Sequence, residues 1–387
     1  GNLPQFTSCC PAWVQFVERR YPLLIPYLSS CRSPQQMMGA TVKNHFAGLA
    51  GIARDRLFVV SIVPCLAKKV EAARPEYAPG GNRDVDAVLT TAEMLDMIRL
   101  MRIDTGAVEP AEFDEPYRRV SSAGVLFGAS GGVAEAALRM AVEKITGTPR
   151  AEGLDFGEVR GFAGVKEAVV DAGGTGIRVA VVSGLRNVEP IVERVLAGEE
   201  CGYDLIEVMG CPGGCICGAG HPIPERTGEL DERQKVLVTI DRQSPLRRSH
   251  ENPDVLSLYA QYYGEPNSAR AHELLHTHYT PLRRQEAGPR KAEDSAFRVH
   301  ELRVCVCDEC RALGAEELYS DLQLRIHALK MTDFLEARPI RLGDAHNGEG
   351  IYVSIDGKRV AVDKLGNLYR SLRDIAPLAK HWYSSRP

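Results

Sequence analysis

Tyr203-Asp204-Leu205-Ile206-Glu207-Val208-Met209-Gly210-Cys211-Pro212-Gly213-Gly214-Cys215 is the stretch that decides the fold. Its first part, residues 203–208, is rich in apolar and β-branched side chains and predicts a short strand, which runs directly into the loop between two cysteines. Glycines let such a loop wrap closely around a bound group, and Pro212 stiffens the turn. The stretch therefore predicts a strand whose carboxyl end carries a thiol-lined binding loop.

Another strand that leads into a cysteine-bearing loop, here followed by a helix, occurs earlier in the chain. Residues 56–62 are apolar, Pro64-Cys65 follows at once, and a helical stretch rich in Lys, Glu and Ala comes next. Residues 177–183 predict a further strand, followed by a helical pattern over 188–196. Strands that alternate with helices favour an α/β fold with parallel pairing, in which functional loops lie at the carboxyl ends of the strands.

A third cysteine segment, Thr7-Ser8-Cys9-Cys10-Pro11-Ala12-Trp13, lies near the start of the chain. A [4Fe–4S] cluster takes four thiolates. The three segments supply four suitable ligands: Cys10, Cys65, Cys211 and Cys215. The chain's eleven cysteines are too few and too clustered for a secreted disulfide framework, and we interpret the isolated Cys31 and Cys201 as reduced thiols.

Composition limits the class of protein. The 387 residues are enough for two or three domains, and 44% hydrophobic with 25% charged residues is typical of a soluble globular protein. A net charge of −4 favours neither nucleic acid nor an anionic membrane as a partner. No apolar run reaches the ~18 residues of a membrane span, and no signal peptide is visible. We expect a cytoplasmic protein.

Two further patterns each allow two interpretations. The glycine-rich turn 127–132 precedes a helical run at 133–145 and is either an anion-binding loop or a tight turn under a cofactor; the match to a dinucleotide fingerprint is poor, which favours the turn. The polar segment 248–279 is either a zinc site or solvated helix whose histidines pack and hydrogen-bond. We favour the second, because ligand spacing typical of zinc sites is absent around its four histidines, His250, His272, His276 and His278.

The cysteine segments together resemble the three signatures of the [FeFe] hydrogenases. Residues 33–36, 83–88 and 127–133 are also similar to the catalytic domain of that family, and residues 249–253 and 272–276 to its small-subunit-type tail. The resemblance implies a two-lobed α/β fold, with parallel sheets flanked by helices over residues 1–230 and a helical tail over 231–282.

The resemblance also implies a cofactor, the H-cluster, in which a [4Fe–4S] cubane is joined through one cysteine to a di-iron unit with CO, cyanide and azadithiolate ligands. Cys10, Cys65 and Cys211 would bind the cubane alone, and Cys215 would bridge to the di-iron unit. The implied activity is the reversible conversion of H2 into two protons and two electrons by heterolytic cleavage.

Four more residues acquire roles from the resemblance, and each has a plainer alternative. Cys9 would exchange protons with the bridging amine, or be an inert thiol. Ser29 would be the next proton step outward, or a helix cap. Lys68 would donate to a cyanide ligand, or begin a solvated helix. Met209 would pack against the di-iron unit, or belong to the core.

The chain departs from the family pattern at several places. Val63 replaces a usual Met, Gly210 replaces a usual Ala, and Cys217 and His221 are additions after the last cluster cysteine. The family's catalytic domain continues upstream of Thr7, so we expect either another chain that supplies this part or a fragment. Without ferredoxin-like cysteine runs before Thr7, electrons would come from ferredoxin, from an NAD(P)H-linked subunit or through the C-terminal domain.

That C-terminal domain, residues 299–387, follows a linker at 283–298 and contains a hairpin signal at Asp356-Gly357. It resembles the thioredoxin-like [2Fe–2S] proteins of the NADH-dehydrogenase small-subunit type, in which Cys305 and Cys310 would form the first ligand pair. No cysteine follows Cys310, so the domain is degenerate. Two interpretations stay open: Cys307 joins them as a third ligand of an iron–sulfur site, or the domain is a metal-free docking module.

Three other functions share these sequence features. One is a hydrogenase-like iron–sulfur assembly factor, which has the fold without the di-iron unit; the joint presence of Cys9, Lys68 and Cys215 argues against it. Another is a hydrogen-sensing member with low turnover, against which Cys9 also argues. The last is a structural partner whose site stays empty.

Overall fold

The computed structural model describes residues 2–148, 153–224, 228–282, 300–305, 307–308, 310, 315–328, 335–340, 353–355 and 358–360. The chain divides into two compact units. The first comprises Gly1–Pro222 with Glu232–Arg284, and the second comprises Ile223–Asp231 with Gln285–Pro387. Within the described ranges, every helix is too short or too polar to cross a membrane. The predicted linker, 283–298, lies outside these ranges, and the predicted boundary after residue 230 stays a prediction.

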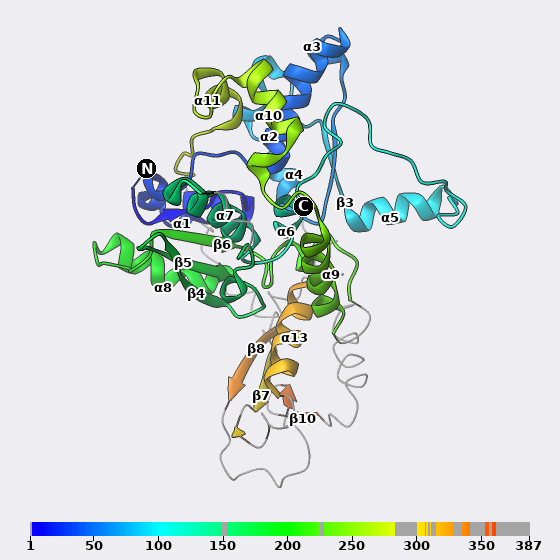
Figure 1. Cartoon of the computed structure of the whole chain (residues 1–387). Coiled ribbons are helices and arrows are strands. Elements are labelled where there is room, and N and C mark those ends of the chain that lie inside the picture. Colours follow the sequence, from blue (N-terminus) through cyan, green and yellow to red (C-terminus); the bar gives the residue numbers. More distant parts are fainter. Residues whose placement is uncertain are drawn as a thin grey trace. The chain divides into compact units, whose positions relative to one another are not determined.

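A four-stranded sheet forms the centre of the first unit (Figure 1). Its strands lie in the order β1 (Gln5–Phe6), β6 (Leu205–Met209), β5 (Thr175–Ser183) and β4 (Val165–Ala172). β6 pairs parallel with both β1 and β5, as the α/β pattern predicts. The strand predicted at 203–208 is therefore present, although it begins and ends slightly later in the chain.

β4 is a strand that the sequence analysis missed. It pairs antiparallel with β5, so this edge of the sheet is a hairpin and the sheet is mixed. Gly173 and Gly174 lie between the two strands with φ of 70° and 90°. A Gly-Gly pair between two strand-like runs is a hairpin signal, because both turn positions need positive φ.

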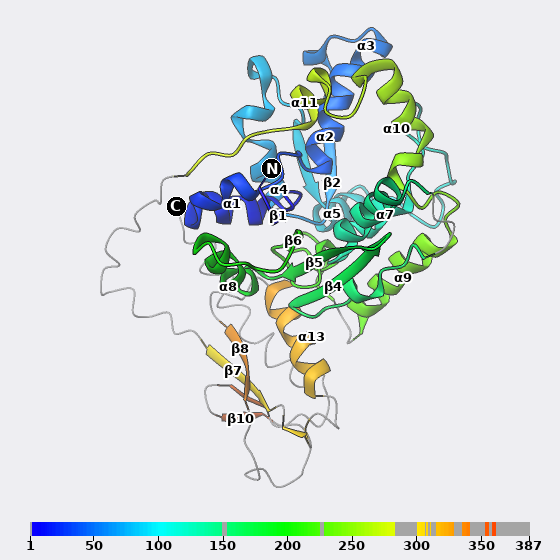
Figure 2. The same ribbon diagram turned by 60° about the vertical axis from the view of Figure 1, so that its left-hand side comes forward.

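The core lies on both faces of β5, whose side chains alternate between two clusters. Ala180 and Val182 pack on one face, with residues of α1 (Pro11–Arg20) and α8 (Leu185–Leu196). Val179 and Val181 pack on the other face, with residues of α7 (Gly132–Thr146). Figure 2 shows α8 and α7 on opposite faces of this sheet. Burial on both faces explains why β5 is a continuous apolar run, as is usual for an inner strand of an α/β sheet.

A second, two-stranded parallel sheet carries the Cys65 segment. β2 (Val60–Val63) pairs in register with β3 (Ala87–Thr90). The predicted strand at 56–62 is shorter than expected, because Arg54–Arg56 forms a 3-10 turn. α4 (Ala67–Ala72) follows β2, and α5 (Thr91–Leu100) follows β3 behind a capping box.

Short helices complete the first unit. α2 (Pro34–Thr41) and α3 (Ala47–Ala50) precede the two-stranded sheet, and α6 (Ser122–Leu126) precedes α7. The tail contains α9 (Glu229–Gln243), α10 (Pro253–Leu258), a π-helical turn at Tyr259–Tyr263 and α11 (Ala269–Leu275).

Three of the four histidines of the tail pack or hydrogen-bond through their rings, which agrees with the interpretation favoured from the sequence. His250 Nε2 lies 3.1 Å from a Glu143 carboxylate oxygen. His276 Nδ1 lies 2.9 Å from the Ser30 hydroxyl, and its ring stacks on that of His272 at a centroid distance of 4.6 Å.

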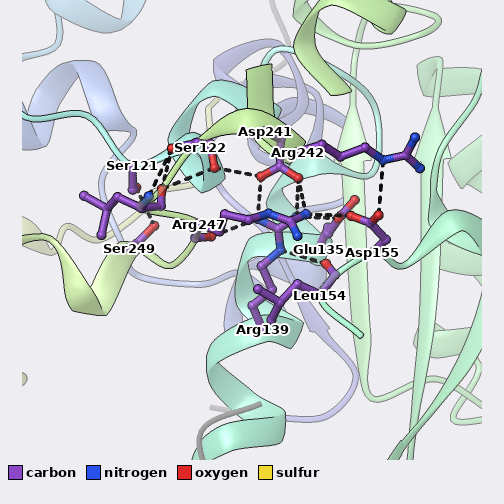
Figure 3. A network of polar contacts seen from close by, with 12 residues as sticks. Ser121, Ser122, Glu135, Arg139, Leu154, Asp155, Asp241, Arg242, Arg247 and Ser249 are labelled. Atoms are coloured by element: carbon purple, nitrogen blue, oxygen red, sulfur yellow. Dashed lines mark hydrogen bonds and ion pairs between the residues drawn. The ribbon is translucent and has the colours of Figure 1, made fainter. Parts of the chain in front are cut away.

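A buried network of charges joins the tail to α7 (Figure 3). Arg139 of α7 donates to both carboxylate oxygens of Asp241 in α9, at 2.7 and 2.8 Å, and to Glu135 at 2.8 Å. Arg247 donates to Asp241 at 2.6 Å and to Asp155 at 2.6 Å. Arg139 and Arg247 lie between the carboxylates of Glu135, Asp155 and Asp241 and neutralise them. These three acidic residues therefore form an ion-pair network that needs no metal ion.

The network makes stability depend on pH. Burial alone would raise the pKa of Asp241, but the hydrogen bonds from Arg139 and Arg247 outweigh it and hold the pKa below its ordinary value. The pKa of Asp155 is lowered in the same way. A depressed pKa means that the stabilisation is complete above the unfolded value of ~3.9 and is lost as pH falls through the folded value. We expect the urea midpoint to fall more steeply below about pH 5 in the parent chain than in Asp241→Asn; equal slopes would contradict this assignment.

The second unit contains a four-stranded sheet of its own. Its order is β10 (Lys358–Val360), β9 (Val353–Ile355), β7 (His300–Cys305) and β8 (Leu335–Ile340), with α13 (Ala315–Ala328) between β7 and β8 in the chain. β7 and β8 are parallel and the other pairs antiparallel. β9 and β10 flank the predicted hairpin turn, and Asp356-Gly357 itself lies outside the described residues.

Candidate metal centre

Three strands of the first unit end at the three cysteine segments. β1 leads to Cys9 and Cys10, β2 leads to Cys65, and β6 leads to the loop of Cys211 and Cys215. The Thr7 amide donates to the Ile206 carbonyl at 3.0 Å, which places the first segment beside the third. The Gly210 amide donates to Cys10 Sγ at 3.3 Å. The parallel pairing of β1 with β6 thus brings Cys10 and the Cys211–Cys215 loop, which are distant in sequence, to the carboxyl ends of two neighbouring strands.

The Cys65 segment is held by the residues that follow Cys215. The Gly220 amide donates to the Pro64 carbonyl at 3.2 Å, and the Ala92 amide donates to Gly220 at 2.9 Å. A Cβ added to Gly218 would lie 2.1 Å from the Pro64 carbonyl oxygen. Only glycine permits this approach, so the glycines after the last cysteine fix the distance between two cysteine segments.

The glycine-rich turn at 127–132 packs directly against the Cys211–Cys215 loop. The Ser130 amide donates to the Gly213 carbonyl at 3.1 Å, and the Ile216 amide donates to Gly128 at 2.7 Å. Gly214 has a φ of 92°, and a Cβ there would lie 2.4 Å from the Ser130 nitrogen. The turn therefore supports the thiol loop, as the favoured interpretation requires.

The backbone amides at the start of α7, the helix that follows this turn, donate to the side-chain carboxylate of Glu207. The amides of Gly131 and Ala134 donate to the two carboxylate oxygens of Glu207, at 2.6 and 2.7 Å. The free N–H groups at the start of α7 are thus satisfied by a side chain of β6. This arrangement leaves no reason to assign a nucleotide to the turn.

Burial and mutual charge raise the pKa values of Cys65, Cys211 and Cys215, which indicates that these three thiols share one enclosed space with Cys10. Burial and then the charges of Cys10 and Cys65 raise the pKa of Cys215 to about 12. Burial, followed by Cys10 and Cys215, raises the pKa of Cys211 well above its ordinary value. The pKa of Cys65 is raised by burial and by Cys10, although the amides of Lys68 and Ala67 oppose this.

These shifts test whether the residues fit an iron–sulfur cluster. Four thiolates in one enclosed space repel each other, so they need a cationic group among them, and iron supplies that charge. The Gly210 amide is already directed at Cys10 Sγ. The donor set and its charge therefore fit a bound iron–sulfur cluster.

Lys68 faces these thiols and is held in place by Glu71. Its ammonium donates to Glu71 at 3.3 Å, and the carboxylate also accepts from Ser33 at 2.8 Å and from Gln35 at 3.2 Å. Burial would lower the pKa of Lys68, but Glu71 and then Cys65 and Cys215 raise it overall. The side chain is 12% exposed and carries a fixed positive charge, which differs from a solvated helix start.

The other predicted residues lie around the same site. Burial, followed by the charge of Glu207, raises the pKa of Cys9 well above its ordinary value, and Lys68 opposes this. Met209 is buried at the end of β6. The Ser29 hydroxyl accepts from the Cys31 amide at 3.3 Å, and the described residues show no hydrogen bond between it and Cys9. The structure thus brings Cys9 and Lys68 to the four thiols but does not join Ser29 to them directly.

A buried pair of charges beside the site was not predicted. Glu207 is fully buried, and Lys166 donates to the Ser130 carbonyl at 3.1 Å and to Gly161 at 2.8 Å. Burial lowers the pKa of Lys166 to about 8, against the attraction of Glu207. The available signal was a glutamate between Ile206 and Val208, at an inward position of a strand that leads to the cysteine loop.

Of the two departures after Cys215, Cys217 is buried and His221 is half-buried. Cys217 is 3% exposed, and its Sγ lies 2.9 Å from where a Cβ on Gly213 would be. Burial, followed by the charge of Arg233, lowers the pKa of His221 to about 4, so its ring is neutral near pH 7.

Comparison with known proteins supports this geometry. Residues 1–219 match the family model described as the iron-only hydrogenase large subunit, C-terminal domain. The chain belongs to the iron-only hydrogenase family. Residues 227–282 match a second model, the iron hydrogenase small subunit. Membership of this family implies that the chain binds an iron–sulfur cofactor.

Relatives of this iron-only hydrogenase family member include a hydrogenase subunit and an assembly factor. The NADP-reducing hydrogenase subunit HndD of Solidesulfovibrio fructosivorans is 46% identical over 279 residues, which are 72% of this chain and 47% of that protein. The cytosolic Fe-S cluster assembly factor narfl of Xenopus tropicalis is 31% identical over 302 residues, 74% of this chain and 61% of that protein.

A solved structure of apo [FeFe]-hydrogenase HydA1 from Chlamydomonas reinhardtii superposes with a TM-score of 0.63 at 41% identity, and covers 72% of this chain and 76% of that one. The agreement confirms the predicted iron-hydrogenase fold. The chain spans about half the length of the hydrogenase relatives that it matches.

Proposed function

We propose that this chain carries the catalytic centre of an [FeFe] hydrogenase, which converts H2 reversibly into two protons and two electrons. The observation that carries the proposal is that Cys9 and Lys68 face the same enclosed space as the four candidate cluster cysteines. An assembly or structural cluster needs only the four thiolates, whereas hydrogen chemistry also needs a proton carrier and a group for anionic ligands.

Each residue has a definite task in this proposal. Cys10, Cys65 and Cys211 hold the cubane, and Cys215 links it to the di-iron unit. The bound H-cluster supplies the site of hydrogen chemistry and the route for electrons. Lys68, fixed by Glu71, offers a positive donor to a cyanide ligand. Cys9 would hold and pass a proton at Sγ, Ser29 would accept it further out, and Met209 would pack against the di-iron unit.

Electron partners form part of the proposal. The chain would exchange electrons with ferredoxin or with an NAD(P)H-linked subunit, and the similarity to a subunit named NADP-reducing supports the second. We also propose that a further polypeptide segment, on this chain or another, completes the catalytic domain, because the relatives are about twice as long as the matched region.

An iron–sulfur assembly factor is the second candidate, favoured by the 31% identity to narfl. Anaerobic infrared spectroscopy separates the two. The protein is produced together with the hydrogenase maturation proteins, with and without the remaining part of the relatives' catalytic domain supplied in trans. Bands from CO and cyanide that shift under H2 are expected. About four irons per chain without such bands, under both conditions, would favour the assembly factor.

Cys9→Ser tests the proton carrier. A positioned acid–base group contributes about 10²–10⁴ in rate, because it carries a proton in the rate-determining transfer. We expect H2 evolution from a reduced viologen to fall by roughly that factor, while the CO and cyanide bands persist. Cys201→Ser removes another buried thiol away from the site and is the matched control. Full turnover in Cys9→Ser would refute this role for Cys9.

A further inference from the structure

The second unit contains a group of thiols that the proposed hydrogen chemistry does not use. Cys305 ends β7, and Cys307 and Cys310 follow within the next five residues. Their three Sγ atoms all lie within 4.8 Å of one another. Cys305 and Cys310 are completely buried, and Cys307 is half-buried. The three thiols thus point into one small space at one end of the unit's sheet.

The fold explains why these thiols converge. β7 is an inner strand, paired parallel with β8 and antiparallel with β9. Leu302, Val304 and Cys305 of the strand are completely buried, and the Sγ atom of Cys310 lies within 4.8 Å of that of Cys305 at the strand's end. Ligand sites of α/β units commonly lie at the carboxyl ends of inner parallel strands. The arrangement is therefore set by the backbone and not by a chance meeting of side chains.

The spacing fits one metal ion. In a tetrahedral zinc site the Zn–S bonds are ~2.3 Å, so neighbouring sulfurs are about 3.8 Å apart. All three sulfur separations here fall below 4.8 Å, within the small adjustment that metal binding brings. A [2Fe–2S] cluster instead requires four protein ligands divided between two irons. The sequence has no cysteine after Cys310 to provide a second pair.

We propose that Cys305, Cys307 and Cys310 bind a single thiophilic divalent ion, zinc, with three thiolates and a fourth position for an exogenous ligand. Thiolate sulfur selects zinc over the hard cations magnesium and calcium. Binding would release the three thiol protons, and the ion would offset most of the negative charge that burial makes costly. The site would fix the turn after β7 in place of the cluster that the related [2Fe–2S] domains carry.

Metal content of the full chain tests the proposal. Wild-type protein, purified under reducing conditions and supplied with zinc, is compared with the triple variant Cys305→Ser/Cys307→Ser/Cys310→Ser. The cysteines of the first unit are the same in both proteins, so any zinc bound there contributes equally to both zinc contents and drops out of their difference. We expect the triple variant to lose about one zinc per chain, whereas the control Cys31→Ser/Cys201→Ser loses none. Equal zinc in wild type and triple variant would overturn the proposal.

A second measurement needs no substitution and so covers a triple variant that fails to fold. The wild-type chain is alkylated under reducing conditions with and without zinc, and each cysteine peptide is followed by mass spectrometry. Zinc should slow alkylation of Cys305, Cys307 and Cys310 together, and a chelator should restore it. Unchanged alkylation at the three positions contradicts zinc binding. So does iron with acid-labile sulfide that the wild-type chain binds and the triple variant lacks, because it means an iron–sulfur cluster.

Discussion

Cys215→Ser is expected to abolish hydrogen turnover and to remove the CO and cyanide infrared bands. Cys215 is the one thiol assigned to both halves of the cofactor, so its loss detaches the di-iron unit as well as one corner of the cubane. The surroundings of Cys215 disfavour a negatively charged side chain, so a serine there would be a poor replacement ligand. Burial and the neighbouring thiolates already raise the pKa of Cys215 to about 12, and an alkoxide there would be formed at much greater cost.

The loop itself should survive this substitution, since its shape comes from the backbone. Gly214 approaches the Ser130 amide, and the Ile216 amide donates to Gly128 at 2.7 Å, so neither contact involves the sulfur. The expected product is a folded chain with little iron. Iron analysis and infrared spectra of the matured protein, together with circular dichroism, would establish this.

Cys217→Ser is the matched control, because it changes a buried thiol two residues away in the same loop. It should keep the bands and turn over hydrogen within a few-fold of the parent chain. The opposite pattern, with the bands lost in Cys217→Ser and kept in Cys215→Ser, would move the ligand assignment by two positions and refute the role proposed for Cys215.

The cysteine segments could be predicted because the residues that indicate their chemistry lie next to one another in the sequence. The Cys65 and Cys211–Cys215 segments each lie directly after a strand-like run, and the period of side chains in these runs is short enough to read from a single sequence. The α/β pattern also predicts parallel pairing, which β6 makes with β5. The strands β1, β3 and β4 of the first unit were not predicted: β1 has only two residues, and β4 pairs antiparallel with β5 at the sheet's edge, across the Gly173-Gly174 turn.

The charged groups could not be predicted, because their partners are distant in sequence. Glu207 is anchored by amides 76 and 73 positions away, and nothing near it in sequence indicates a helix start. Arg139 and Asp241 are 102 positions apart and belong to regions matched by two different family models. Roles taken from resemblance have the same limit: the resemblance makes Ser29 the next proton step outward from Cys9, yet the hydrogen bond that its hydroxyl makes among the described residues is with the Cys31 amide.

Arg139→Met should destabilise the first unit by about 3–5 kcal/mol, the cost of breaking a buried ion pair by removing one partner. Arg139 and Asp241 have no exposed side-chain surface, and Glu135 has 1%. Methionine fills a similar volume but leaves both carboxylates without their central donor. It also removes the bond from Arg139 to the Leu154 carbonyl at 2.9 Å. Urea unfolding followed by circular dichroism measures the change.

Arg242→Ala is the control at the rim of the same network (Figure 3). Arg242 is 61% exposed and contacts Asp155 at 3.2 Å, so its removal should cost at most about 1 kcal/mol. The double variant Arg139→Met/Asp241→Asn should recover part of the loss, because it removes an unpaired buried charge together with its former partner. If Arg139→Met were no more destabilising than Arg242→Ala, the network would not fasten the tail to α7. The two regions, matched by separate large- and small-subunit models, would then be held by their other contacts, such as those of His250 with Glu143 and of Arg119 with Asp254.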